Sequence, residues 1–303
     1  MSDNRKKRFV ITLMVAVIVV LAAGAFLFGP WGPFKGFIFS HENVEKKGSS
    51  ELHETGDKEV AQHRNDSRKT EAGQRIEKES NTSPPSVAIV VDDVGTVEEK
   101  LAEWTKIDAP ISFSVMPYPP LSSTLAEKLY QAGYVIMMHI PTENQPPNSF
   151  AGEGQLSCNM NRQDVCATLD ADLAEVPHVS GINNHQGGRG CDDLQLMTFE
   201  CEWARQHGFY VVDSKSSANS LVSYAAVQLG MGRKRNQVFI DHQNDPEYIR
   251  SAMRELADIA RQDGYAIGIC HWHRPNTAKT VGEMVEILKA EGIHFAFARD
   301  INN

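Results

Sequence analysis

Short apolar runs alternate with segments of helical spacing along most of the chain. The apolar runs lie at residues 87–91, 111–116, 134–139, 179–185, 209–213, 237–241, 265–271 and 294–298. The segments with helical spacing lie at 97–107, 121–132, 162–175, 192–207, 220–230, 246–261 and 280–291. Apolar runs of this length are typical of buried parallel strands. The strict alternation of strand and helix predicts a parallel sheet with right-handed crossovers.

The number of strand–helix units favours a barrel over an open sheet, and a doubly wound sheet is the alternative. No Gly-x-Gly-x-x-Gly follows the first strand, and no phosphate-binding loop with Gly-Lys-Ser or Gly-Lys-Thr occurs, which argues against a nucleotide site. The periodic part, residues 86–303, is long enough for one large domain. We therefore expect an α/β fold in a single domain over 86–303.

The first 29 residues have a membrane-directed pattern. A basic tail at 1–8, with Arg5, Lys6, Lys7 and Arg8, precedes an apolar run at 9–29. About 20 residues at roughly 1.5 Å each match the hydrocarbon core of a bilayer. The basic cluster predicts a cytoplasmic tail and a single transmembrane signal-anchor, with the rest of the chain in the periplasm. A cleaved secretory signal is the alternative, but the apolar run continues past the small residues at 22–25.

Composition adds a linker and excludes one class of partner. Residues 30–85 are predicted to be a polar linker, since from about residue 40 they hold almost no apolar side chains and cannot form a core. The chain has 30 basic and 39 acidic side chains, a net charge of −9, which argues against a nucleic-acid partner. The five cysteines are an odd number, so at least one is expected to be unpaired.

Polar side chains follow most of the predicted strands at the point where each strand ends. They are Asp92, Asp93, His139, Glu143, Asn184, His185, Asp213, Asp241 and His271. A single residue of this kind is often a helix cap, but parallel barrels build their sites from the carboxyl ends of several strands. One carboxylate and two imidazoles with an open position would suit a catalytic zinc ion.

Five segments of the chain resemble the divergent polysaccharide deacetylases, which are relatives of the NodB-type carbohydrate esterases. They are Val-Val-Asp-Asp-Val-Gly (90–95), His-Ile-Pro-Thr-Glu (139–143), Gly-Ile-Asn-Asn-His-Gln-Gly (181–187), Val-Asp-Ser-Lys-Ser-Ser-Ala (212–218) and Ile-Gly-Ile-Cys-His (267–271). The resemblance covers roughly 86–300. It implies a distorted (β/α)7–8 barrel and a divalent metal, usually taken to be zinc.

The resemblance also implies roles for individual residues. The metal ligands would be Asp93, His139 and His185, with the two histidines supplied by the ends of two successive strands. Asp92 would act as the general base and His271 as the general acid.

Further residues are expected around these five. Those expected to bind substrate or to support the site are Glu143, Asn184, Asp213 and Lys215. Those expected at the surface, without a role in the site, are Asp241, His242 and His273.

The chain departs from the family pattern in ways that bear on the substrate. His-Ile-Pro-Thr-Glu replaces the commoner His-Leu-Pro-Met-Glu, and Gln186 and Gly188 stand where Met and Ser are more usual. The Arg and Trp motifs that shape the sugar site of ordinary deacetylases are not evident. The first hypothesis is a metal-dependent envelope hydrolase that deacetylates a glycan, peptidoglycan-related glycans included, by attack of metal-bound water. The alternatives are an inactive scaffold that binds peptidoglycan or an envelope protein, and a hydrolase of a non-sugar acyl group.

Overall fold

The computed structural model describes residues 84–301. The predicted tail at 1–8, the anchor at 9–29 and nearly all of the linker at 30–85 therefore lie outside the described residues. Within 84–301, no helix is both long and apolar enough to cross a bilayer. All five cysteines lie in this part of the chain, and each is free.

Eight strands alternate with seven α-helices in the described part of the chain. The strands are β1 (Ser86–Val94), β2 (Ile111–Val115), β3 (Val135–Thr142), β4 (Val179–Gln186), β5 (Tyr210–Val212), β6 (Val238–Phe239), β7 (Tyr265–His271) and β8 (His294–Phe295). The helices are α2 (Leu101–Trp104), α3 (Ser122–Gln131), α4 (Arg162–Glu175), α5 (Leu194–Gln206), α6 (Val222–Gln228), α7 (Pro246–Asp263) and α8 (Thr277–Ala290). Two short 3₁₀ helices, η1 (Gly190–Asp192) and η2 (Ala298–Asp300), complete the fold.

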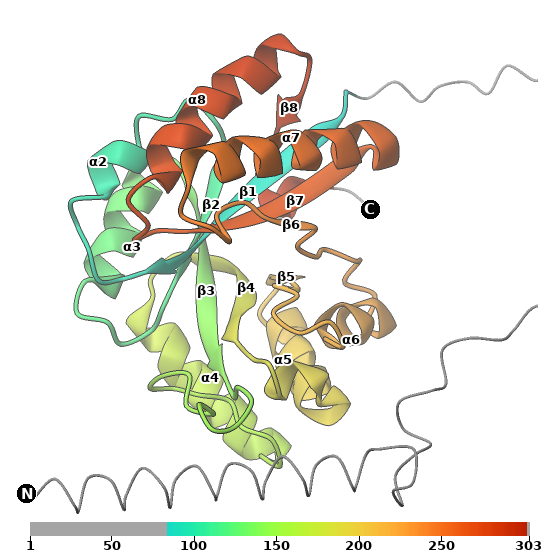
Figure 1. Ribbon diagram of the computed structural model, residues 1–303. Coiled ribbons are helices and arrows are strands. Elements are labelled where there is room, and N and C mark those ends of the chain that lie inside the picture. Colours follow the sequence, from blue (N-terminus) through green and yellow to red (C-terminus); the bar gives the residue numbers. More distant parts are fainter. Residues whose placement is uncertain (1–83, 302–303) are drawn as a thin grey trace, which may run out of the picture. The chain divides into compact units, whose positions relative to one another are not determined.

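The strands form one curved parallel sheet in the order β5-β4-β3-β2-β1-β7-β6, with β8 added to β1. Figure 1 shows the helices arranged around these strands. The order is that of a barrel in which β7 lies next to β1. Between the two edges, the amide of Asp213 donates to Lys234 and the amide of Asn236 donates to Asp213, which makes one isolated bridge. The distorted (β/α) barrel is therefore confirmed, and its seam lies between β5 and β6.

Both faces of the central strand are buried, which explains its unbroken apolar run. On β1, Val87, Ile89 and Val91 belong to the cluster packed against the helices, whereas Ala88 and Val90 face the barrel interior. The remaining interior side chains are Met137, Val212, Ile267, Ile269, Ala298 and Ile301. Apolar residues thus fill the barrel below the carboxyl ends of the strands, where the polar side chains gather.

The longest helix shows why the sequence signals were reliable for most elements. The side chain of Asp245 accepts a hydrogen bond from the amide of Tyr248, and Pro246 stands at the first helical position of α7. Gly264, with a φ of 88°, ends the helix in the left-handed conformation that favours glycine. Start and stop residues of this kind define a helix locally.

The helix predicted over 97–107 is wrong in extent, because α2 covers only Leu101–Trp104. Gly95 has a φ of 147° and lies so close to the turn before α3 that an added Cβ would stand 2.6 Å from Oγ of Ser122. The carbonyl of Gly95 also accepts a hydrogen bond from the amide of Leu121. This tertiary contact holds the chain directly after β1 in a turn, so the helix begins only at Leu101.

Candidate metal centre

A bulge at the end of β1 brings two consecutive carboxylates to the same side of the strand. Val91 pairs with Phe113 and Val94 with Val115, so Asp92 and Asp93 together face a single residue of β2. Asp93 has a φ of 64°, a left-handed conformation that is uncommon outside glycine and often marks functional sites. In a regular strand, neighbouring side chains would point to opposite faces.

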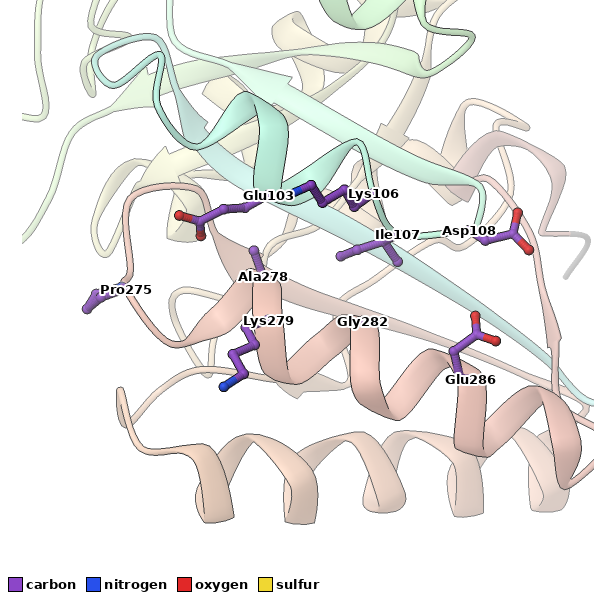
Figure 2. A pocket seen from close by; sticks show the side chains of 9 residues that line it. All are labelled: Glu103, Lys106, Ile107, Asp108, Pro275, Ala278, Lys279, Gly282 and Glu286. Atoms are coloured by element: carbon purple, nitrogen blue, oxygen red, sulfur yellow. The ribbon is translucent and has the colours of Figure 1, made fainter.

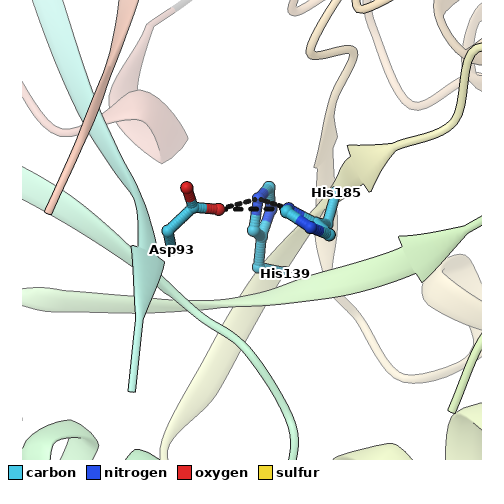
Figure 3. A group of neighbouring side chains, drawn as sticks. All are labelled: Asp93, His139 and His185. Carbon is cyan, nitrogen blue, oxygen red and sulfur yellow. Dashed lines mark hydrogen bonds and ion pairs between the residues drawn. The ribbon is translucent and has the colours of Figure 1, made fainter. Parts of the chain in front are cut away.

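Asp93, His139 and His185 converge at the mouth of the barrel (Figure 3). Oδ1 of Asp93 lies 3.4 Å from Nε2 of His139 and 3.0 Å from Nδ1 of His185. The two ring nitrogens are 3.2 Å apart. Ligand atoms held about 2.0–2.1 Å from a tetrahedral zinc ion are themselves about 3.3 Å apart. The three distances therefore suit one divalent cation.

The Asp93 oxygen that faces both imidazoles also fits a metal site. Oδ1 of Asp93 is buried and accepts no hydrogen bond from any residue of the described part of the chain, 84–301. A buried carboxylate oxygen without a donor is costly unless it binds a cation. One carboxylate and two imidazoles form a donor set typical of a catalytic zinc ion with an open position.

Asn183 connects His139 with Asp92, the first carboxylate of the bulge. Its Oδ1 lies 2.9 Å from Nδ1 of His139 and also accepts a hydrogen bond from Ser114. Its Nδ2 donates to Oδ1 of Asp92 at 2.8 Å and to Ser214. Because Nδ1–H of His139 donates a hydrogen bond to the Asn183 oxygen, Nε2 is the ring nitrogen left for a metal.

The ionisation of the cluster follows from burial and from the opposite charges within it. Burial raises the pKa of Asp92, and the charges of His139 and His271 and the hydrogen bond from Asn183 offset this only in part. Burial would also raise the pKa of Asp93, but its contacts with His139 and His185 lower that pKa well below its usual range. For His139, burial lowers the pKa, yet Asp92 and Asp93 raise it to about 9. A bound cation would replace the proton on this imidazole.

His271 at the end of β7 is held by a buried carboxylate. Its Nδ1 lies 2.7 Å from Oδ1 of Asp241, and its amide donates to Oδ2 of Asp241 at 2.9 Å. Burial would lower the pKa of His271, but the hydrogen bond and the charge of Asp241 raise it. His271 is therefore suited to carry a proton that it can give to a leaving group.

One cavity of about 430 Å³ contains the three potential ligands together with Asp92 and His271. Its other lining residues are Asn184, Gln186, Ser214, Ser216, Phe239, His242 and Arg274. A potential cation site, a buried carboxylate and a carboxylate-paired histidine thus open onto the same space.

The comparison with protein families decides the family of this fold and site. The model for "Divergent polysaccharide deacetylase" matches residues 89–301, most of the chain. The chain belongs to this family.

The chain is also similar to two uncharacterized proteins. Over 202 aligned residues, the chain is 27% identical to YibQ of Escherichia coli K12. The aligned residues make up 66% of this chain and 62% of YibQ. Over 192 aligned residues, the chain is 28% identical to a protein of Haemophilus influenzae. The aligned residues make up 63% of this chain and 68% of that protein. Among solved structures, the uncharacterized protein ATU2773 of Agrobacterium tumefaciens is similar, with a TM-score of 0.67 and 20% identity over 73% of this chain and 90% of that chain. This likeness shows the fold.

Asn184 lines the cavity, but its side chain contacts α5 and not the potential ligands. Its Nδ2 lies 2.9 and 3.0 Å from the carboxylate oxygens of Glu200 on α5 and also donates to Thr142. Glu200 is fully buried, and burial raises its pKa to about 8. Asn184 therefore connects β4 with the outer helix layer, while its neighbour Asn183 faces the site.

The other three residues expected around the site lie in the loops that frame it. Glu143 pairs with Arg189 and accepts a hydrogen bond from the amide of Cys158, which joins the loops after β3 and β4. Asp213 accepts hydrogen bonds from Lys215, Ser220 and Ser223, which shapes the turn before α6. The Lys215 ammonium donates to the carbonyl of Ala218 in its own loop. None of the three lines the cavity that contains the metal centre.

Three residues of the centre were missed or misplaced by the sequence reasoning. Asp241 was expected at the surface, and this was wrong, because it is fully buried under His271. Nδ1 of His273, also expected to have no role, lies 3.7 Å from Oδ2 of Asp93. Asn183 was overlooked in favour of Asn184. Strand periodicity was the available signal, since residues two apart share a face and Asn183 lies two before His185.

A second cavity, of about 560 Å³, lies between α2 and α8 (Figure 2). It is lined by apolar groups such as Ile107 and Ala278 and by side chains of both charges, including Glu103, Lys106 and Glu286. None of its lining residues belongs to the metal centre. The cavity at the mouth of the barrel is therefore the candidate active site.

Proposed function

We propose that this chain is a metal-dependent hydrolase of the cell envelope that removes the acetyl group from an N- or O-acetylated glycan. The observation that carries the proposal is the shared cavity of Asp92, His271 and the three potential metal ligands. Membership of the divergent polysaccharide deacetylases supports the acetylated glycan as the substrate class.

Asp93, His139 and His185 would hold the cation, and their donor set suits zinc. A bound zinc ion supplies a lowered pKa for the attacking water and polarisation of the acetyl carbonyl. The Asn183 amide keeps the His139 ring in the orientation that presents Nε2 to this site.

Asp92 is placed to act as the general base. Oδ1 is occupied by the hydrogen bond from Asn183, which leaves Oδ2 for a proton from the attacking water. Its raised pKa, caused first by burial, makes it a stronger base than an exposed aspartate. The new carbon–oxygen bond then forms at the acetyl carbonyl.

His271 is placed to act as the general acid. Asp241 accepts from Nδ1, so Nε2 is the position from which a proton can move to the leaving nitrogen or oxygen. The bond between the acetyl carbon and that atom breaks as the proton arrives, which releases acetate and leaves an amine or a hydroxyl on the sugar. A paired carboxylate that orients the imidazole is a common device in hydrolases.

The cellular location rests on the N-terminal pattern. The basic tail at 1–8 and the apolar run at 9–29 support an inner-membrane anchor with the hydrolase domain in the periplasm. Acetylated glycans of the envelope, peptidoglycan-related ones included, would then be within reach of the site. The net charge of −9 supports the absence of a nucleic-acid partner.

Metal content and acetate release of the purified full-length chain test the proposal. We expect close to one divalent ion per chain and release of acetate from N- or O-acetylated glycan oligosaccharides. His185→Ala should lose most of the metal and all of the turnover. One bound metal ion without hydrolysis of any acetylated glycan would overturn the enzymatic proposal in favour of an inactive scaffold that binds peptidoglycan or an envelope protein.

A further inference from the structure

The side chain of Arg274 is the one cation of the candidate active site that the mechanism leaves unused. Arg274 lies three residues after β7 and lines the same cavity as Asp93, His185 and His271. Its Nε is buried, and within residues 84–301 no hydrogen-bond partner of Nε is found. The only hydrogen bond found for it within residues 84–301 runs from Nη1 to the carbonyl of His242, at 3.5 Å. A guanidinium group has five N–H donors, so most of them are left for a ligand.

Asp241 does not satisfy this guanidinium. Nε of Arg274 lies 3.9 Å from Oδ2 of Asp241, which is beyond hydrogen-bond distance. That carboxylate already accepts from the ring of His271, from the amide of His271 and from the hydroxyl of Thr277. Arg274 therefore lies in the cavity of the metal centre beside Asp241, with which it forms an ion pair but no hydrogen bond.

The charges in the cavity point to an anionic ligand. A bound divalent cation offsets Asp92 and Asp93, and a protonated His271 offsets Asp241. The other polar residues that line the cavity are Asn184, Gln186, Ser214, Ser216 and His242, and none of them carries a carboxylate. The positive charge of Arg274 is then uncompensated in a partly enclosed space, where an opposite charge from a ligand is most favourable.

We propose that Arg274 binds a carboxylate of the substrate, so that the preferred substrate is an acidic acetylated glycan whose sugar carries a carboxylate directly or through an ether. This inference rests on the proposed function. The planar guanidinium matches a carboxylate through two parallel hydrogen bonds, which a lysine cannot reproduce. Arg274 would then select among acetylated glycans, while Asp92 and His271 perform the same chemistry on each.

Three matched glycans test the inference on the full-length metal-loaded chain. They are an acetylated disaccharide that contains N-acetylmuramic acid, the methyl ester of the same disaccharide, and a neutral N-acetylglucosamine disaccharide. We expect kcat/KM to be about 10- to 100-fold higher for the free acid than for its ester, mainly through KM. In Arg274→Gln the ratio of kcat/KM for the acid to that for the ester should fall to about one. In Arg274→Lys the ratio should lie between that of Arg274→Gln and that of the unmodified chain.

A control variant separates local from general charge effects. Arg254→Gln removes the same charge from the exposed face of α7 and should leave the ratio of acid to ester as it is. A ratio near one in the unmodified chain would overturn the inference. So would a loss of kcat in Arg274→Gln that is equal for the three glycans, since that result indicates support of Asp241.

The failure of the proposed function can be told apart from the failure of this inference. If the unmodified chain hydrolyses none of the three glycans, the enzymatic proposal fails, and calorimetric binding of the same glycans tests Arg274 by itself. Tighter binding of the acid than of the ester, lost in Arg274→Gln, would support the carboxylate site even then. Equal binding of acid and ester would overturn it.

Discussion

Nδ1 of His139 lies 2.9 Å from Oδ1 of Asn183, and this contact determines which ring nitrogen of His139 faces Asp93. The amide oxygen accepts a hydrogen bond from Nδ1–H, so Nε2 is directed to Oδ1 of Asp93 at 3.4 Å. The amide nitrogen of the same side chain donates to Asp92. One asparagine therefore orients both a potential metal ligand and the potential base.

Replacing Asn183 should weaken metal binding, although Asn183 is not itself a ligand. Asn183→Ala removes the acceptor that orients His139, and lost support of this kind typically lowers metal affinity by about 10- to 100-fold. Competition with a chromogenic chelator would measure the change. Asn184→Ala is the matched control, because Asn184 contacts Glu200 on the other face of β4 and should lower stability without changing metal affinity. Equal metal affinities for the two variants would contradict this assignment.

Substitutions of the two adjacent carboxylates of the bulge, Asp92 and Asp93, should have different effects on metal binding and on turnover. Asp93→Asn removes a ligand charge and should lower metal occupancy, whereas Asp92→Asn should keep the metal and lose turnover by at least about 100-fold. Elemental analysis and acetate release on both variants measure the two effects. Loss of metal from Asp92→Asn, with occupancy kept in Asp93→Asn, would exchange the two roles.

The pH dependence of the reaction should respond to Asp241. A general acid must be protonated, so activity falls as the pH rises through the pKa of His271. Asp241 raises that pKa, so Asp241→Asn should move the basic limb of kcat/KM to lower pH. Thr277→Val removes only the hydroxyl that donates a hydrogen bond to Asp241, so it should shift the basic limb of the pH profile much less. An equal loss at every pH would argue against this role of Asp241.

Asp172, buried on α4 away from the metal centre, should make the fold less stable as the pH rises. Burial and the charges of Glu153 and Glu175 raise its pKa to about 7, and contact with Tyr118 lowers it only in part. The folded carboxyl binds its proton more tightly than the unfolded one, so the free energy of unfolding falls between about pH 4 and pH 7 and is then constant. Asp172→Asn should raise the free energy of unfolding by ~2–4 kcal/mol at pH 8.

Urea unfolding at two pH values measures this effect. The gain from Asp172→Asn should be nearly absent at pH 4, where the aspartate is protonated in both states. Asp258→Asn, an exposed change on α7, should alter stability by less than about 0.5 kcal/mol at either pH. A gain of equal size at pH 4 and pH 8 would show that ionisation of Asp172 is not its cause.

The sequence was sufficient to predict the order of the elements and the edge at which the site forms. The apolar run before Asp92, the capping residues Asp245 and Gly264, and the polar residues at strand ends are all local signals. Parallel strands bring their carboxyl ends to one edge, so Asp93, His139 and His185 could be expected near one another without knowledge of any distance.

Only the tertiary structure decided which polar neighbours take part. Asn183 and Asn184 are identical side chains, and the pleat of β4 directs one to His139 and the other to Glu200. The hydrogen bond between Asp241 and His271 depends on how the chain after β6 lies beside β7. The side chains of Asp92 and Asp93 lie on the same side of β1 only because of a bulge. Local periodicity fixes the type of an element, whereas register, bulges and the approach of one strand to another arise from contacts between residues far apart in the chain.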